Sequence, residues 1–492
     1  MPDVNVNGTG DCSIVLKHMG LLRIQALIDG AWVDAQSGRR FDVLDPATRE
    51  VVASVPDMSR EDTQRAILAA HRAWPEWRNR TAKERGAALR RWFDLIVAHQ
   101  DDLAAIMTME QGKPLAEAKG EILFAASFID WFAEEGKRTY GDVIPTYNRD
   151  RRIIVLKQPI GVVAAITPWN FPSGMVTRKC APALAAGCTI VLKPAEDTPL
   201  SALALAELAQ QAGIPPGVLN VVTTSSQRVA EVGDELCRNP VVKKISFTGS
   251  TAVGKRLMQQ AAGTVKKIGL ELGGSAPFIV FEDADLDIAV QAAINSKFRA
   301  SGQTCTCSNR FLVQAQVYDA FACKFVQAVE KLSVAPGREP GSTIGPLINT
   351  PALEKVSAHV EDACRRGARL LVGGRRHALG GTFYEPTVLA DVTTEMLVCR
   401  EETFGPVAPL IRFESEADAV RTANDSQYGL ASYFFTRDLA RAWRVAEALE
   451  CGSVAINEGS FASEVVPVGG FKESGIGREG SRYGIDGYLE IK

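Results

Sequence analysis

The feature that most constrains this chain is the alternation of short apolar β-type runs with amphipathic helical runs from about residue 160 onward. CTIVLKP, GVLNVVT and KKISFTGS predict strands, SALALAELAQQAG and TAVGKRLMQQAAG predict helices, and Gly or Pro stands at the joints. Such alternation is typical of βα units around a mainly parallel sheet. A second round of the pattern follows Glu271, with APFIVF, RFLVQ and CGSVAIN as strands.

The rest of the chain completes this organisation. Residues 61–136 repeat apolar side chains at intervals of three and four, which predicts helices ahead of the alternating region. A length of 492 residues favours two or three domains, at roughly 150 residues each. The composition, 46% hydrophobic and 23% charged, is that of an ordinary globular protein. We therefore expect two α/β domains.

Charge and targeting signals argue against several classes of protein. The 55 basic and 58 acidic residues are interspersed and give a net charge of −3, which leaves no basic stripe for nucleic-acid phosphates. No apolar run reaches the roughly 18 residues of a membrane span, and the N-terminus lacks the pattern of a signal peptide. Most of the ten cysteines stand singly in apolar stretches, which favours a reducing compartment. We expect a cytoplasmic protein with no metal site and no nucleic-acid or membrane partner.

Two glycine-rich motifs imitate nucleotide sites without meeting their requirements. GIGREG (475–480) has the G-x-G-x-x-G pattern, but only 12 residues follow it, too few for a βαβ unit. GSTAVGK (249–255) resembles a P-loop, yet Arg256 stands where Ser or Thr must reach Mg²⁺. This second motif still places a tight turn between a predicted strand and a predicted helix, where backbone N–H groups make an anion site. An ordinary helix cap by Ser250 explains it equally well.

Four short stretches, far apart in the chain, each place a chemically useful residue beside glycine, proline or an aromatic side chain. They are TPWNFP with Asn170, LELGG with Glu271, GQTC with Cys305 and EETFGPV with Glu402. Each residue also has a plain interpretation, as a turn residue, a strand-end acid, a core thiol and a helix-capping acid. No histidine lies near Cys305 in sequence, so a carboxylate base fits this thiol better than a Cys–His pair.

Together the four stretches resemble the aldehyde dehydrogenase superfamily, and the similarity runs from about Ala26 to the C-terminus. The intervals of 101 residues from Asn170 to Glu271 and of 34 from Glu271 to Cys305 are those of the family. The resemblance implies that Cys305 attacks the aldehyde carbon, while the Asn170 amide and the Cys305 backbone N–H hold the oxyanion. Hydride transfer to a nicotinamide then leaves a thioester, which water hydrolyses with Glu271 as general base.

The resemblance also implies an architecture. It predicts a Rossmann-like NAD-binding domain in 1–136 and 160–270, an α/β catalytic domain in 271–470, and a small β oligomerisation arm in 137–159 and 471–492. By the same resemblance we expect a homodimer or homotetramer. Two rival interpretations conflict with the residues present. A non-catalytic structural protein on this fold is expected to have lost the nucleophile, base or oxyanion residue, and a CoA-acylating dehydrogenase needs no base for hydrolysis.

The cofactor implied by the family is NAD, with NADP possible but less favoured. Lys193 and Glu196 would hold the adenosine ribose, and the Glu196 carboxylate would repel the additional 2′-phosphate of NADP. If Glu196 instead points to solvent, both cofactors would be accepted. The residues that the resemblance assigns to the cofactor are Ile166, Trp169, Lys193, Glu196, Gly249, Ser250, Thr251, Gly254, Glu402 and Phe404.

Within the superfamily the chain most resembles the succinate-semialdehyde branch. Arg178 stands eight residues after Asn170, where we expect the same helix, and Arg299 stands six residues before Cys305. Two arginines that flank a nucleophile suit the carboxylate at the far end of a short ω-oxo acid. The alternative is that both form surface or interdomain ion pairs.

Two further expectations concern residues near the nucleophile. The branch carries a carboxylate-binding serine where this chain has Ala462, so either Ser463 substitutes or the substrate is a related aldehyde such as glutarate semialdehyde. Relatives with the C-T-C spacing of Cys305 and Cys307 can close a reversible disulfide that blocks catalysis. The alternative is that Cys307 is a small packed residue.

Overall fold

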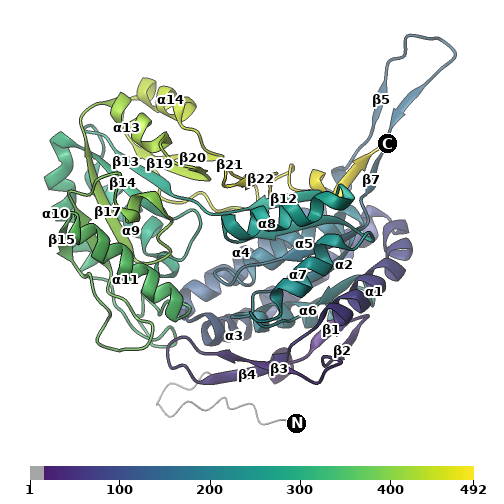
Figure 1. The fold of residues 1–492 in the computed structure, drawn as a ribbon. Helices are drawn as coiled ribbons and strands as arrows, with labels where there is room; N and C mark the ends of the chain where they lie inside the picture. The colour runs from purple at the N-terminus through teal and green to yellow at the C-terminus, as the bar shows by residue number, and fades with distance from the viewer. Residues whose placement is uncertain (1–15) are drawn as a thin grey trace.

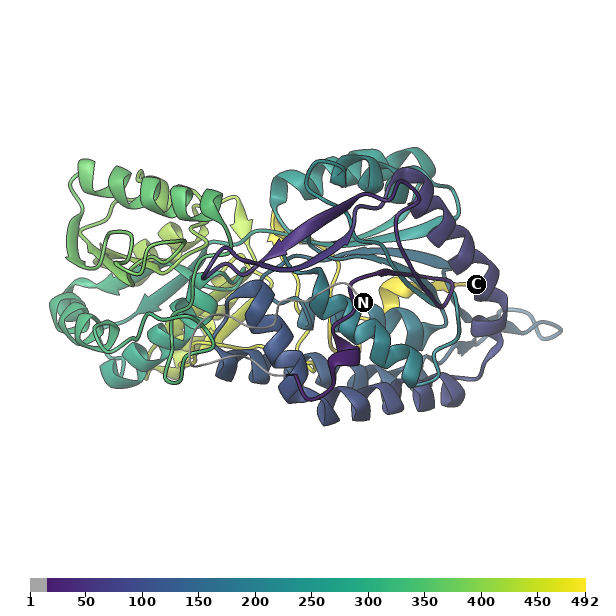
Figure 2. The same cartoon turned by 90° about the horizontal axis from the view of Figure 1, so that it is seen from below.

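The computed structural model describes residues 16–492 and divides into two α/β lobes, each built on one sheet (Figure 1). A two-stranded ribbon projects from the lobe that contains most of the N-terminal half (Figures 1 and 2). No helix among these residues is both long and apolar enough to cross a membrane.

The first lobe is organised around an eight-stranded sheet of order β2-β1-β10-β9-β8-β11-β12-β22. Its five middle strands, from β10 to β12, are parallel, whereas β1, β2 and β22 pair antiparallel at the edges. The strands are β1 Ala26–Ile28, β2 Ala31–Val33, β8 Val162–Ile166, β9 Thr189–Lys193, β10 Leu219–Val221, β11 Val242–Thr248, β12 Lys267–Glu271 and β22 Gly475–Ile476. Of these strands, the sequence pattern predicts β9, β10 and β11.

Helices cover this sheet, and its parallel strands are buried because apolar clusters pack on both faces. Capping boxes fix the first two helices, with Ser59 and Asp62 at α1 and Thr81 and Glu84 at α2. The helices are α1 Arg60–Asn79, α2 Ala82–Ala98, α3 Gln100–Gln111, α4 Leu115–Glu135, α5 Gly174–Ala186, α6 Pro199–Gln211, α7 Val229–Arg238 and α8 Thr251–Ala261.

The second lobe contains a seven-stranded sheet of order β15-β16-β17-β14-β13-β19-β20, in which only β15 is antiparallel to its neighbour. The strands are β13 Ala276–Val280, β14 Ser308–Gln314, β15 Arg369–Val372, β16 Thr387–Ala390, β17 Val407–Phe413, β19 Ala431–Phe435 and β20 Ser453–Ile456. The helices are α9 Leu286–Lys297, α10 Tyr318–Val329, α11 Thr350–Arg365, α12 Leu397–Arg400, α13 Glu416–Asn424 and α14 Leu439–Ala448.

Short strand pairs complete the fold. The projecting ribbon is formed by β5 and β6, and the C-terminal strand β23 pairs with β7 at its base (Figure 1). The pairs are β3 Arg40–Leu44 with β4 Val51–Pro56, β5 Asp142–Ile144 with β6 Ile153–Val155, β7 Lys157–Pro159 with β23 Leu489–Ile491, and β18 Tyr428–Gly429 with β21 Phe471–Lys472. The domain boundaries and the oligomerising role of the arm stay predictions.

Candidate active site

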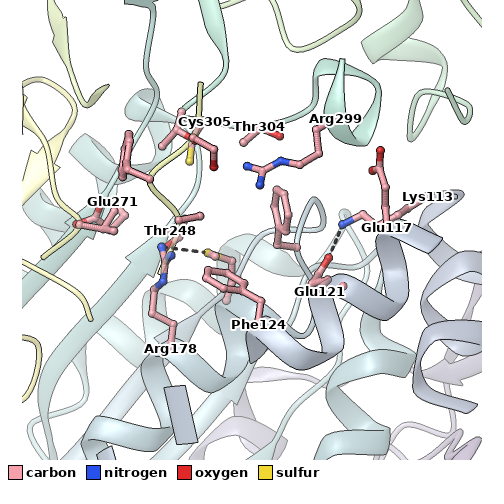
Figure 3. Close-up of a pocket in the computed structure, with 18 residues that line it drawn as sticks. Lys113, Glu117, Glu121, Phe124, Arg178, Thr248, Glu271, Arg299, Thr304 and Cys305 are labelled. Carbon is pink, nitrogen blue, oxygen red and sulfur yellow. Dashed lines mark hydrogen bonds and ion pairs between the residues drawn. The ribbon is translucent and has the colours of Figure 1, made fainter. Parts of the chain in front are cut away.

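A cavity of about 360 Å³ opens between the two lobes. Helices α4 and α5 and the ends of β11 and β12 line it from the first lobe, and the loops around residues 299–306 and 460–468 line it from the second (Figure 3). Its charged lining consists of Lys113, Glu117, Glu121, Arg178, Glu271 and Arg299, and Cys305 supplies a thiol.

Cys305 lies in the loop between the short 3-10 helix Arg299–Gly302 and β14, and its side chain faces the cavity (Figure 3). The loop is packed tightly against Gly274, where an added Cβ would lie 2.4 Å from the Cys305 carbonyl oxygen. Burial, aided by the negative charge of Glu402, raises the pKa of the Cys305 thiol to about 12. Since the thiolate is the nucleophile, this thiol must lose a proton before it reacts.

Glu271 is the last residue of β12 and shares the cavity with Cys305. Its side chain is buried, and one carboxyl oxygen, Oε1, has no hydrogen-bond partner among the described residues. Burial and the nearby charge of Glu479 raise the pKa of Glu271 well above its usual value. A carboxyl group held neutral in this way becomes a base only after it releases its proton, which is typical of a tuned catalytic acid or base.

Asn170 lies in the loop before α5, which corrects the expectation that it shares a helix with Arg178. The helix begins only at Gly174, and Pro172 accounts for the delay because a proline disfavours helical geometry at the residue before it. The Asn170 side-chain amide donates a hydrogen bond to the Gln303 carbonyl at 3.0 Å. One amide hydrogen thus ties Asn170 to the Cys305 loop, and the second is left for an oxyanion.

The turn between β11 and α8 has the shape predicted for a phosphate site, but its hydroxyls already have protein partners. Ser250 caps α8 by accepting from the Val253 N–H at 3.4 Å, and the Thr251 hydroxyl donates to the Glu473 carbonyl at 3.3 Å. The backbone N–H groups of the first turn are therefore its main donors to an anion. The backbone approaches its neighbours closely here, since a Cβ at Gly254 would lie 2.4 Å from Leu272.

The remaining predicted cofactor residues form two groups. At the carboxyl end of β9, Lys193 Nζ is 3.1 Å from Glu196 Oε2. On the other side of the site, Glu402 accepts a hydrogen bond from the Gly274 N–H at 3.0 Å, and the Trp169 and Phe404 rings make an edge-to-face contact at 5.5 Å. Burial raises the pKa of Glu402 to about 7.

These groups suit a dinucleotide. Ile166 ends β8, the parallel strand next to the Gly249 turn, and an added Cβ at Gly249 would lie 2.5 Å from the Phe247 ring. The Lys193–Glu196 pair suits the adenosine ribose. The N-terminus of α8 suits the pyrophosphate. Glu402, near the two aromatic rings, suits the nicotinamide ribose. We conclude that the residues present fit NAD(P).

Arg178 and Arg299 both reach the cavity, and neither forms an ion pair with an acid in residues 16–492 (Figure 3). The Arg178 guanidinium lies 4.9 Å from the Phe128 ring centre and 5.7 Å from that of Phe124. The Arg299 guanidinium lies 5.5 Å from the Phe171 ring centre. The Nε atoms of both arginines are buried without a partner. The alternative that these arginines serve ion pairs within the chain is therefore wrong.

Ser463 does not line the cavity, which corrects its candidacy as a substrate ligand. Its hydroxyl donates to the adjacent Glu464 carboxylate at 3.2 Å. Ser460 and Ala462 lie on the cavity wall instead.

Several cavity residues were not predicted. The first turns of α4 contribute Glu117 and Glu121, and Lys113 lies two residues before this helix. The aromatic part of the wall consists of Phe124 and Phe171. The run GKPLAEAKGE indicates a helix and nothing about which face meets a ligand. The one usable signal was the four-residue spacing of Glu117 and Glu121, which places both acids on one face of the helix.

Cys307 is fully buried, and its thiol is 3.6 Å from the Lys297 carbonyl oxygen. All nine cysteines in the described part of the chain are free thiols. A regulatory Cys305–Cys307 disulfide stays a prediction.

Comparison with known proteins gives a consistent result. Residues 32–492 match the Aldehyde dehydrogenase family. The chain is 61% identical to a glutarate-semialdehyde dehydrogenase of Pseudomonas aeruginosa, and 60% identical to the NADP(+) succinate-semialdehyde dehydrogenase of Escherichia coli. Each alignment covers 97% of this chain and 98% of the relative. The crystal structure of a succinate-semialdehyde dehydrogenase from Burkholderia pseudomallei superimposes with a TM-score of 0.96 at 61% identity, covering 97% of this chain and 98% of that one.

Proposed function

The chain belongs to the aldehyde dehydrogenase family, and from this premise we propose that it oxidises a short aldehyde whose far end carries a carboxylate. One observation carries the proposal: the cavity that holds Cys305 also holds two arginines without an acidic partner in residues 16–492. A buried cation without a partner is costly, and a substrate carboxylate would supply that partner through charge-assisted hydrogen bonds.

The residues divide the reaction between them. Cys305 loses its proton and attacks the aldehyde carbon to form a thiohemiacetal, whose oxyanion is held by the second Asn170 amide hydrogen and the Cys305 backbone N–H. NAD(P), when bound, supplies the hydride acceptor. Glu271, once deprotonated, takes a proton from the water that attacks the resulting Cys305 thioester. The thiol is thereby regenerated and the carboxylic acid released.

Succinate semialdehyde is the substrate that we favour, with glutarate semialdehyde as the alternative. The similar relatives carry both names, at 60% and 61% identity. At Ala462 the cavity wall offers a methyl group instead of a hydroxyl, and Ser460 supplies a hydroxyl nearby. This difference in hydrogen bonding favours neither chain length by itself.

An aldehyde panel tests the proposed function. The purified enzyme is given succinate semialdehyde, glutarate semialdehyde or butanal, and reduction of the cofactor is followed by absorbance. We expect kcat/KM for at least one semialdehyde to exceed that for butanal by about 10- to 150-fold, which corresponds to one charge-assisted hydrogen bond worth about 1.5–3 kcal/mol. Equal values for all three aldehydes would contradict the proposal.

For the cofactor, we propose a preference for NAD over NADP. The Glu196 carboxylate is held 3.1 Å from Lys193, and this cation contributes to lowering the pKa of Glu196 although burial opposes it. An ionised acid at this position repels a 2′-phosphate. The E. coli relative bears NADP in its name, so the preference needs its own measurement. We expect the NAD/NADP ratio of kcat/KM to exceed one in the wild type and to fall in Glu196→Ser. A wild-type enzyme that prefers NADP would contradict the proposed preference for NAD.

We further propose that the chain forms a homo-oligomer through the ribbon of β5 and β6. An isolated two-stranded ribbon is marginally stable in water, and this one exposes large apolar side chains. Tyr140, Val143 and Tyr147 are 71%, 75% and 87% exposed. Apolar surface of this kind marks an interaction site. Light scattering after size-exclusion chromatography would show a dimer or tetramer, and a monomer at all concentrations would contradict this proposal.

A further inference from the structure

The two arginines of the cavity lie on separate segments, and one helix contacts both segments. Glu117 and Glu121 stand one turn apart at the start of α4, so their side chains leave the same face of the helix. Each carboxylate accepts hydrogen bonds from backbone N–H groups of a segment that carries an arginine. Figure 3 shows both acids on the α4 side of the cavity.

Glu121 holds the segment of Arg178. One oxygen of its buried carboxylate accepts from the Ser173 N–H at 3.0 Å and from the Gly174 N–H at 3.1 Å. These are the first donors of α5, which has no side-chain cap of its own, so an acid on another helix does the capping. Arg178 follows one turn later. The other Glu121 oxygen pairs with Lys113, which in turn donates to the Asn170 carbonyl at 2.9 Å.

Glu117 holds the segment of Arg299. Its carboxylate accepts from the Ala300 N–H at 2.8 Å. Ala300 and Ser301 both adopt left-handed backbone geometry, with φ of 49° and 56°, and such a conformation is strained for a non-glycine residue. Strained segments persist only where their surroundings hold them. The bond from Glu117 and the bond from the Ser301 hydroxyl to the Gly345 carbonyl at 2.9 Å are such restraints.

We propose that Glu117 and Glu121 are positioning residues that aim Arg299 and Arg178 at the substrate carboxylate, so that α4 sets the relative placement of the two guanidinium groups. This inference rests on the proposed function, because it takes the arginines to be the carboxylate site. It differs from a purely structural role in one respect. Removing the backbone hydrogen bonds of Glu117 or Glu121 lowers the affinity for carboxylate aldehydes more than the affinity for neutral ones.

The test compares Glu117→Ala, Glu117→Gln and Glu121→Gln with wild type, using succinate semialdehyde and butanal. We expect Glu117→Ala to raise KM for succinate semialdehyde about tenfold, the loss of one charge-assisted bond, while KM for butanal changes less than about threefold. Glu117→Gln keeps an oxygen for the Ala300 N–H and should recover most of that loss. Glu121→Gln should raise the semialdehyde KM, because an amide oxygen accepts more weakly and Lys113 loses its counter-charge.

The matched control is Glu134→Ala, which removes an acid from the other end of α4 where it pairs with Lys137 on the surface. It should leave both KM values unchanged. The inference is overturned if the Glu117 and Glu121 variants raise KM for both aldehydes alike. Should Glu117→Ala fail to fold, the KM values of Glu121→Gln decide it alone, because the effect of Glu121 through Lys113 on Asn170 changes kcat for both aldehydes. Arg178→Ala and Arg299→Ala separate the two ideas. If the arginine variants discriminate between the aldehydes and the acid variants do not, the inference fails and the proposed function stands. If the arginine variants do not discriminate between the aldehydes, the proposed function fails.

Discussion

The site contains two kinds of ionisable group that use charge in opposite ways. Cys305, Glu271 and, beside the cavity, Glu402 are acids, and burial raises the pKa of each. Arg178 and Arg299 are permanent cations packed against aromatic rings. The acids therefore hold protons that can move, and the arginines hold charge that cannot.

This difference separates chemistry from recognition. A group with a raised pKa keeps its proton until the reaction calls for its release, whereas a guanidinium keeps its charge at every relevant pH. Substitutions of the acids should change kcat and the pH profile. Substitutions of the arginines should raise KM mainly for substrates that carry a charge.

The largest effect is expected for Cys305→Ala, which removes the nucleophile. Aldehyde oxidation should fall by about 10⁴-fold or more, to the limit of detection, because without the thiol neither the thiohemiacetal nor the thioester forms. The measurement is cofactor reduction with the preferred aldehyde. Cys307→Ala, two residues away, is the control and should keep most of the activity. Comparable losses in both variants would show that the loop matters and the Cys305 thiol does not.

Glu271→Gln should lose about 10²- to 10⁴-fold in steady-state turnover, the usual contribution of a general base. Its first turnover should survive, because hydride leaves before water attacks. Rapid mixing would then show one equivalent of reduced cofactor followed by a stall at the thioester. Turnover at the wild-type rate would show that the base is another group.

Arg178→Ala and Arg299→Ala should each raise KM for succinate semialdehyde by about 10- to 150-fold, with far smaller changes for butanal. The buried arginine, Arg178, should have the larger effect, since less water is present to replace it. Equal losses on both aldehydes would place these arginines in the chemistry and would remove the distinction between the acids and the arginines.

The pH profile tests the protonation of Cys305 and Glu271 directly. Below a pKa of about 12 the thiolate fraction of Cys305 rises about tenfold per pH unit, and Glu271, whose pKa is raised, also gains its basic form as the pH increases. Activity should therefore increase from pH 7 to pH 9. In Glu271→Gln the burst should still accelerate with pH through Cys305. A profile that falls across this range would contradict both assignments.

The sequence predicted the α/β architecture because alternating apolar runs mark buried strands. Asn170, Glu271 and Cys305 stand in short motifs that resemble the family, and their catalytic roles stay proposals. Relations between segments were harder to predict. Phe171–Pro172 delays α5, so Asn170 and Arg178 do not share a helix.

The substrate side shows the same limit more strongly. No local sequence pattern indicates that Ser460 and Ala462 line the cavity while Ser463 does not. Glu117 and Glu121 look like ordinary helix-surface acids in sequence, and only the packing of α4 against two distant backbone segments reveals their contacts.

The pairing of β22 with β12 has a consequence for how the molecule is made. Gly475 lies opposite Glu271 across this ladder. The strand that completes the sheet edge beside Glu271 is therefore synthesised roughly two hundred residues after Glu271. A ribosome delivers the first lobe and most of the second before that edge can close. Nascent chains that still lack their final segment leave Glu271 on an open strand. A chain that ends before Gly475 would lack this ladder beside Glu271.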